Sequence, residues 1–243
     1  MPSIPTTIVT LACLTLLAST QSGRPSIISS HWTGAATNIQ DSQTTITDSG
    51  SGNIFTAGAV VGSGNATTVL EVSGSNNSIG AVTITGSANS TISLYISGSG
   101  NVFGGITVTG TANSTTNIYI SGSYNSIGGL VVTCSNDALI ELAVLGDQNG
   151  IAGGSLSASD SSSTTWVVSG SWNTLTGDVV TTSGSSSSDV EVTGDSNSLT
   201  GLAAASSDTS HFAITMPANG YADSGRVVTT QLTASTNVRV PSS

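Results

Sequence analysis

The sequence has almost no positive charge: its 243 residues include three arginines, no lysine and 13 acidic side chains. Proteins that bind nucleic acid or anionic membranes need clustered basic residues against the phosphate groups. Nucleic acid and anionic lipid surfaces are therefore excluded as partners. Charged residues make up only 7% of the chain, and the mean hydropathy is +0.22. Disorder is excluded as well, because disordered segments combine high charge with low hydrophobicity.

Cysteine is also scarce, with Cys13 and Cys134 alone. Cys13 lies in an apolar run at residues 8–18, followed by small residues at 19–23. This pattern is typical of a secretory signal peptide and is too short to span a bilayer. A short buried core segment is the alternative, since no basic residue precedes the run. Removal of residues 1–22 would leave Cys134 as a small core residue without a disulfide partner, and no later segment predicts membrane insertion.

The main positive feature of the sequence is an internal repeat. Asparagine recurs with a 24-residue period, with half-period copies at Asn65, Asn89 and Asn113, and glycine stands three positions before each of these asparagines. Gly-x-x-Asn is typical of a tight turn, because glycine and asparagine accept positive φ at little cost. The full-period column consists of Asn53, Asn77, Asn101, Asn125, Asn149, Asn173 and Asn197.

Apolar residues keep the same phase and are spaced two apart, as in Leu94/Ile96 and Ile106/Val108. Spacing of two indicates strands with alternate side chains in a core. Recurring strand and turn predict an all-β fold, a right-handed parallel β-solenoid (β-helix) of about seven coils. Each coil is a 24-residue repeat built from two 12-residue units, because a 12-residue coil would hardly admit Phe, Trp and Leu inside. The expected parts are a signal peptide (1–22), an N-terminal cap (23–40), the solenoid (41–216) and a C-terminal cap or tail (217–243).

The sequence offers little for catalysis or metal binding. The asparagine column is interpreted as a structural ladder, since turn chemistry explains its residue type and position. Asp147 and Asp195 enter two of the turns, but they lie two coils apart and the calcium-binding nonapeptide is absent. No metal, cofactor or catalytic site is expected.

Histidines and carboxylates give no recognisable enzyme site. His31 and His211 lie near the expected caps, without an acidic or nucleophilic partner at a recognisable spacing. A carboxylate pair of the glycosidase type is the alternative. Its candidates fall mostly on outward strand positions several coils apart, where a solvated face is the simpler interpretation: Glu71, Glu141, Asp189 and Glu191.

One expected surface is uncharged and rich in threonine, with a spacing of about 4.8 Å between coils. Such a strip could order water and dock on ice, although threonine is also common on exposed strands for its shape alone. The candidate ice or ligand face consists of Thr83, Thr85, Thr107, Thr109, Thr133 and Thr181.

Two further surface features are candidate interaction or modification sites. Tyr95 and Tyr119 occupy adjacent coils and form a candidate stacking pair for a sugar or a neighbouring protein. Sequons of the form N-x-[ST] are candidate N-glycosylation sites in a eukaryotic secretory pathway. They begin at Asn65, Asn76, Asn89 and Asn113.

The turns SGSNNSIG (73–80), SGSGNVFG (97–104) and SGSYNSIG (121–128) resemble the repeats of grass ice-recrystallisation-inhibiting proteins, which are secreted β-solenoids. They are also similar to G-x-x-N-x-[VI] repeats of uncharacterised bacterial solenoid proteins. The resemblance covers the turns only and implies an ice face at Thr83, Thr85, Thr107 and Thr109, although the shorter grass repeat does not align with those positions.

The expected function is a non-enzymatic structural or adhesive role, secreted to the cell surface or extracellular matrix. Candidate partners are a second copy of the chain, extracellular polysaccharide, a protein matrix or ice. The competing hypothesis is ice binding through the threonine strip. A third is end-to-end assembly into filaments.

Overall fold

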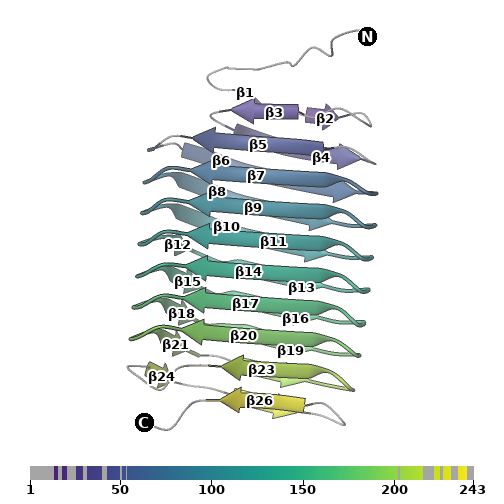
Figure 1. Ribbon diagram of the computed structural model, residues 1–243, viewed down its shortest axis with the longest axis vertical. Helices are drawn as coiled ribbons and strands as arrows, with labels where there is room; N and C mark the ends of the chain where they lie inside the picture. Colours follow the sequence, from purple (N-terminus) through teal and green to yellow (C-terminus); the bar gives the residue numbers. More distant parts are fainter. Residues whose placement is uncertain are drawn as a thin grey trace.

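The computed structural model describes most of the chain, and it describes side chains within residues 51–215, without those of residues 53, 55–57, 202, 204 and 206. Described are residues 14–15, 18–20, 26–29, 32–39, 43–49, 51–215 without Asn53 and Leu202, 222–224, 227–230 and 235–239. Within these residues the fold is all-β and contains no helix. Strands stack one above another from the N-terminal to the C-terminal end (Figure 1).

Parallel pairing in a 24-residue register organises the molecule. Ile106 pairs with Leu130, and Ile118 pairs with Leu142, so each strand lies beside its own copy one repeat later. The fold is therefore a parallel β-solenoid with a 24-residue coil, which confirms the expected fold class and coil length. Its right-handed sense and the number of coils stay predictions.

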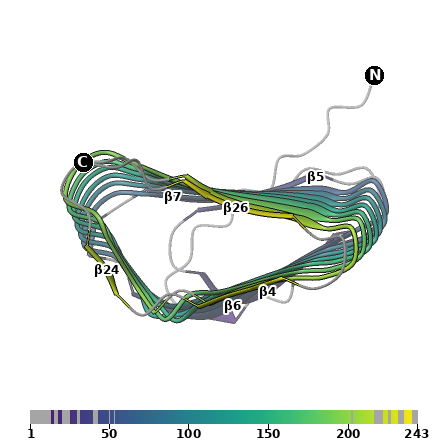
Figure 2. The same cartoon turned by 90° about the horizontal axis from the view of Figure 1, so that it is seen from below.

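One side of the solenoid is a single flat sheet, which we call the flat sheet. Its strands follow the half-period turns, and each spans one side of the coil in Figure 2. They are β3 (Ser26–Ser29), β5 (Gln43–Ser49), β7 (Thr67–Ser73), β9 (Thr91–Ser97), β11 (Thr115–Ser121), β14 (Leu139–Leu145), β17 (Ser163–Ser169), β20 (Ser187–Thr193), β23 (His211–Thr215) and β26 (Ser235–Arg239).

A second, bent sheet forms the other two sides of the coil, a short face and a longer one (Figure 2). Its strands are β1 (Leu14–Thr15), β2 (Ala18–Thr20), β4 (Trp32–Ile39), β6 (Ile54–Ser63), β8 (Ser78–Gly86), β10 (Val102–Gly110), β12 (Ser126–Ile127), β13 (Leu130–Cys134), β15 (Gly150–Ala152), β16 (Gly154–Ala158), β18 (Thr174–Thr176), β19 (Val179–Thr182), β21 (Ser198–Thr200), β22 (Ala203–Ser206), β24 (Ala222–Ser224) and β25 (Val227–Thr230).

The bend between the short face and the longer face is formed by continuous strands in some coils and by a break between two strands in later coils. β8 and β10 run through it as continuous strands, whereas later coils break into two strands at this point. In three of these coils the residue at the break is a glycine with positive φ: Gly153, Gly177 and Gly201. A left-handed residue cannot continue a strand, so these glycines end the short face and start the longer one.

Pairing continues beyond residues 41 and 216 into the segments expected as caps. At the C-terminal end β24, β25 and β26 keep the 24-residue register. At the N-terminal end the register changes to an 18-residue offset, as in Ser26 with Thr44. β1 and β2 pair with β4, while Cys13 and most of the apolar run at residues 8–18 lie outside the described residues.

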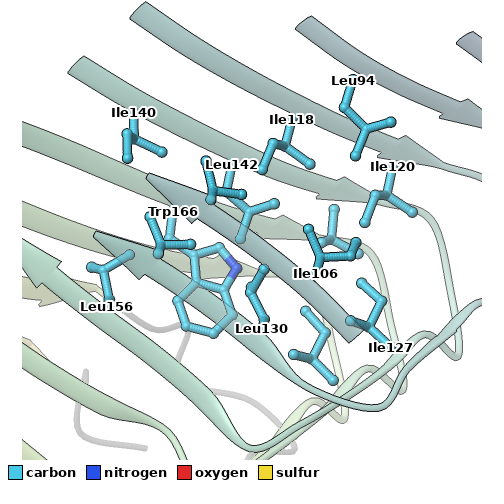
Figure 3. Packing of buried hydrophobic residues seen from close by; sticks show 14 of the residues in the cluster. Leu94, Ile106, Ile118, Ile120, Ile127, Leu130, Ile140, Leu142, Leu156 and Trp166 are labelled. Carbon is cyan, nitrogen blue, oxygen red and sulfur yellow. The ribbon is translucent and has the colours of Figure 1, made fainter. Parts of the chain in front are cut away.

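The core consists of stacked apolar columns from the two sheets. Leu94, Ile118, Leu142 and Trp166 stack on the inner side of the flat sheet, each 2% exposed or less. Ile106, Leu130 and Leu156 face them from the bent sheet (Figure 3). Burial of each such side chain contributes about 1.5–3 kcal/mol, so the expected apolar columns are confirmed as the core.

Candidate functional site

The longer face of the bent sheet, which we call the threonine face, carries all six threonines predicted as a candidate site. Thr83 pairs with Thr107, Thr85 with Thr109 and Thr109 with Thr133. Thr181 extends the second column through Ser157. Their side chains are exposed or half-exposed, and the residues between them, including Ile84 and Val108, are buried.

Regular strand geometry makes this face a rectangular array of side chains. Neighbours lie about 4.8 Å apart between coils and about 6.7 Å apart along one strand. Only two coils carry threonine in both columns. Elsewhere the outward positions hold Val131, Ser155, Ser157 and Val179, with Ala59/Val61 and Ala203/Ala205 at either end, so none of these described positions is charged.

The full-period asparagines are buried, from 0% to 3% exposed, at the corner between the flat sheet and the short face. We call this the asparagine corner. From Asn101 to Asn197, each Oδ1 accepts a hydrogen bond from the backbone N–H of the asparagine one coil earlier, at 2.8–3.0 Å. The ladder joins Asn77, Asn101, Asn125, Asn149, Asn173 and Asn197, and Asn53 lies outside the described residues.

A second ladder runs on the outside of the same corner in the opposite sense. Ser75 Oγ accepts the backbone N–H of Ser99 at 3.2 Å, one coil later. Asp147 takes the place of serine in this column, and its Oδ1 accepts the N–H of Ser171 at 2.7 Å. Asp147 and Asp195 are separated by Ser171, as expected from their spacing.

The half-period corner is built differently, so the two 12-residue units are not structural copies. Asn89 and Asn113 have positive φ and exposed side chains, and the following residue, Ser90 or Ser114, is buried instead. At the asparagine corner the residue before each asparagine has positive φ, not the asparagine itself. At that corner the tolerance of positive φ is therefore used by the glycine of the Gly-x-x-Asn motif and by the residue before the asparagine.

The four predicted sequon asparagines are all exposed. Asn65, Asn89 and Asn113 line the half-period corner, and Asn76 lies at the asparagine corner. Exposure on turns is compatible with modification, which stays a prediction.

Tyr95 and Tyr119 stack on the outer side of the flat sheet. Their ring centroids are 5.4 Å apart and their planes differ by 7°. Partial burial raises the pKa of Tyr119 first, and the hydrogen bond and negative charge of Glu141 raise it further. The pair is thus a pre-stacked aromatic surface beside a carboxylate.

The four carboxylates considered for catalysis lie on outward positions of three strands, and two of them share one strand. Glu71 is on β7 and Glu141 on β14, while Asp189 and Glu191 are on β20. His211 does have an acidic partner, because its Nε2 lies 4.0 Å from Asp189 Oδ1, which corrects the expectation. Both side chains are about half exposed, so solvent screens the pair. His31 lies outside the described residues.

One functional group was missed by the sequence reasoning. Asp178 is fully buried in the core, where its Oδ1 accepts the N–H of Gly154 at 3.0 Å. Its Oδ2 finds no partner among the described residues. Burial raises the pKa of Asp178 from 3.8 to about 6, against the effect of the Gly154 hydrogen bond. The signal was available, since Asp178 occupies a column that holds Val82, Ile106 and Leu130 in other coils.

Cys134 is buried in the core, as its interpretation as a small core residue requires. Its Sγ donates to the carbonyl of Ala138 at 2.9 Å, and burial raises the pKa of the thiol. Within the described residues no three His, Cys, Asp or Glu side chains cluster in a way that could hold a metal ion.

No known protein family, curated protein or solved structure matches this chain. In the described part of the chain, no helix has the length and apolar character needed to cross a membrane.

Proposed function

We propose that this protein is a non-enzymatic, secreted β-solenoid with a structural or adhesive role at the cell surface or in an extracellular matrix. The observation that carries the proposal is the continuous pair of ladders at the asparagine corner. In these turns the Oδ1 of asparagine and the Oγ of serine accept hydrogen bonds from backbone N–H groups of the neighbouring coils. Such a ladder together with a continuous core favours a stiff rod, and sparse charge on the threonine face favours close lateral contact.

Surface retention tests this proposal. The labelled full chain is incubated with intact cells of the organism that encodes it, and with the same cells stripped of wall and matrix. We expect retention on intact cells only. An Ile118→Asp variant, which places a charge in the core, is the unfolded control and should lose retention. Equal wash-off from both preparations would contradict the proposal.

Ice binding through the threonine face is the second candidate. It is favoured by the paired positions of Thr83, Thr85, Thr107 and Thr109, whose hydroxyl and methyl groups repeat in two directions on a stiff surface. The resemblance of the turns to grass ice-recrystallisation-inhibiting proteins points the same way. Ice-recrystallisation inhibition and thermal hysteresis measured on the full chain test it, and a folded monomer without either activity would exclude it.

A further inference from the structure

The asparagine corner carries a further column of residues that belong to neither ladder and are exposed or half-exposed. It consists of the residue before each ladder asparagine, and all six members have a positive φ between 57° and 71°. The column reads Asn76, Gly100, Tyr124, Gln148, Trp172 and Ser196. We call it the corner ridge.

Two residues of this ridge, Tyr124 and Trp172, combine a bulky exposed aromatic ring with a backbone conformation that disfavours bulky side chains. Tyr124 and Trp172 are 65% and 63% exposed, so their rings contribute little to the core. Both have a φ of 62°, a region that strongly disfavours bulky side chains and that Asn76 and Gly100 occupy more easily. Strained backbone under an exposed aromatic ring points to a function of the ring itself.

The spacing of the two rings is set by the backbone. The N–H of Tyr124 donates to the carbonyl of Asp147 at 3.1 Å, the N–H of Gln148 to Ser171 at 2.9 Å and that of Trp172 to Asp195 at 3.0 Å. Equivalent atoms of Tyr124 and Trp172 are therefore two coils apart, or roughly 10 Å. This is the interval between every second ring of a straight β-1,4-linked polysaccharide, whose sugar rings present flat C–H faces.

The surroundings of the rings define the chemistry of such a ligand. Gln148 stands between the two aromatic positions and offers an amide that can donate to and accept from hydroxyl groups. Leu145 replaces the serine found at this position in the neighbouring coils, and it is 41% exposed beside the ridge. Asp147 and Asp195 are exposed along the same corner, so an anionic polymer would be repelled.

We propose that the corner ridge binds a straight, neutral β-1,4-linked polysaccharide, with sugar rings stacked on Tyr124 and Trp172 and a hydroxyl group bonded to Gln148. This inference rests on the proposed adhesive role and names its partner.

Depletion of the full chain from solution by insoluble polysaccharides tests the inference. Microcrystalline cellulose and chitin are the straight neutral probes, starch granules are the control for a curved neutral chain, and calcium alginate beads are the control for an anionic one. We expect depletion by cellulose or chitin and none by starch or alginate. Tyr124→Gly and Trp172→Gly should each weaken binding by roughly tenfold, and the double variant should abolish it.

Glycine suits the left-handed backbone at both positions, as Gly100 does in this column, so these variants should remain folded. Leu139→Thr on the flat sheet removes an exposed apolar side chain away from the ridge and matches its partner Thr115 in the same column. It is the control and should bind like the wild type. Unchanged binding in the double variant, or no binding by the wild type, would overturn the inference. A double variant that binds glycan like the wild type but no longer self-associates would also overturn the inference. The ridge would then be a contact between copies of the chain. If the protein is retained on cells but binds neither cellulose nor chitin, the proposal of an adhesive role is supported and the proposal of glycan binding by the corner ridge is wrong.

Discussion

Asn125 Oδ1 accepts a hydrogen bond from the backbone N–H of Asn101 at 3.0 Å, and both residues are buried. The bond joins equivalent positions of two coils, so one side chain satisfies a donor that no strand pairing reaches. A buried backbone donor left without a partner costs about 1–3 kcal/mol. The ladder therefore explains why asparagine keeps its 24-residue period without interruption.

Replacement of a ladder asparagine should destabilise the protein far more than the same change at the half-period corner. Asn125→Ser leaves the N–H of Asn101 without its acceptor, because serine is too short to reach it. We expect a loss of about 1–3 kcal/mol in urea unfolding. Asn113→Ser is the matched control and should cost under about 0.5 kcal/mol, since Ser161 already occupies this position with a φ of 64°. If both variants lose the same free energy of unfolding, the ladder hydrogen bond contributes no more to stability than the turn at the half-period corner.

Close approach of glycines at the asparagine corner gives a second prediction. A Cβ at Gly122 would overlap the carbonyl oxygen of Gly98, and the φ of Gly122 is 113°. Gly122→Ala should therefore lower the free energy of unfolding by at least about 2 kcal/mol. Gly129→Ala is the control. Apart from its two neighbours in the chain, no heavy atom lies within 4 Å of a Cβ added at Gly129, so the methyl group has room. A neutral result for Gly122→Ala in thermal or urea unfolding would contradict the packing described.

Stability should rise as the pH falls through the titration of Asp178. The folded-state pKa, about 6, lies above the unfolded value of 3.8, so the folded state binds the proton more tightly. The penalty for the buried charge is absent below pH 3.8, grows between pH 3.8 and 6, and is complete above pH 6. It amounts to about 3 kcal/mol.

Asp178→Asn removes this titration and keeps an oxygen for the N–H of Gly154. The variant should be more stable than the wild type at pH 7, and the difference should shrink toward pH 4. Urea midpoints at pH 7, 6, 5 and 4 measure it. Asp208→Asn, an exposed change at a corner, is the control. A difference between the Asp178 variant and the wild type that stays constant with pH would refute the assignment.

The threonine face gives the sharpest test of ice binding. Thr107→Tyr places a bulky ring in the middle of the array and should abolish ice-recrystallisation inhibition if the face docks on ice. Thr115→Tyr makes the same change on an outward position of the flat sheet and should leave the activity intact. A structural role through other faces tolerates both changes. Full activity in the Thr107 variant would remove the face from any ice-binding mechanism.

Much of the architecture follows from the sequence alone. The 24-residue period predicts the register, and spacing of two predicts the inner columns, because stacked copies place like residues beside like. The six threonines share one face for the same reason. The contact between His211 and Asp189 could also have been predicted from the repeat. Ser187 pairs with His211 in the 24-residue register and lies two positions from Asp189 on the same strand.

The difference between the two corners was not predictable from the motif. Both read Gly-x-x-Asn, yet one turn leads from the flat sheet into the short face and the other from the threonine face back into the flat sheet. At the asparagine corner the residue before asparagine takes the positive φ and asparagine is buried, whereas at the half-period corner Asn89 and Asn113 take the positive φ themselves and are exposed. The positive φ at Tyr124 and Trp172 belongs to the first of these two turn types and has no signature in the local sequence.

Because every ladder bond joins equivalent positions of successive repeats, removal of one whole 24-residue repeat would bring equivalent positions together again. Each ladder bond broken in this way would be replaced by another of the same kind. The length of the rod can thus change in whole coils without any redesign of its turns, its core or its faces. Gain or loss of coils by duplication and deletion in the gene would adjust reach and surface area together, in steps of about 4.8 Å.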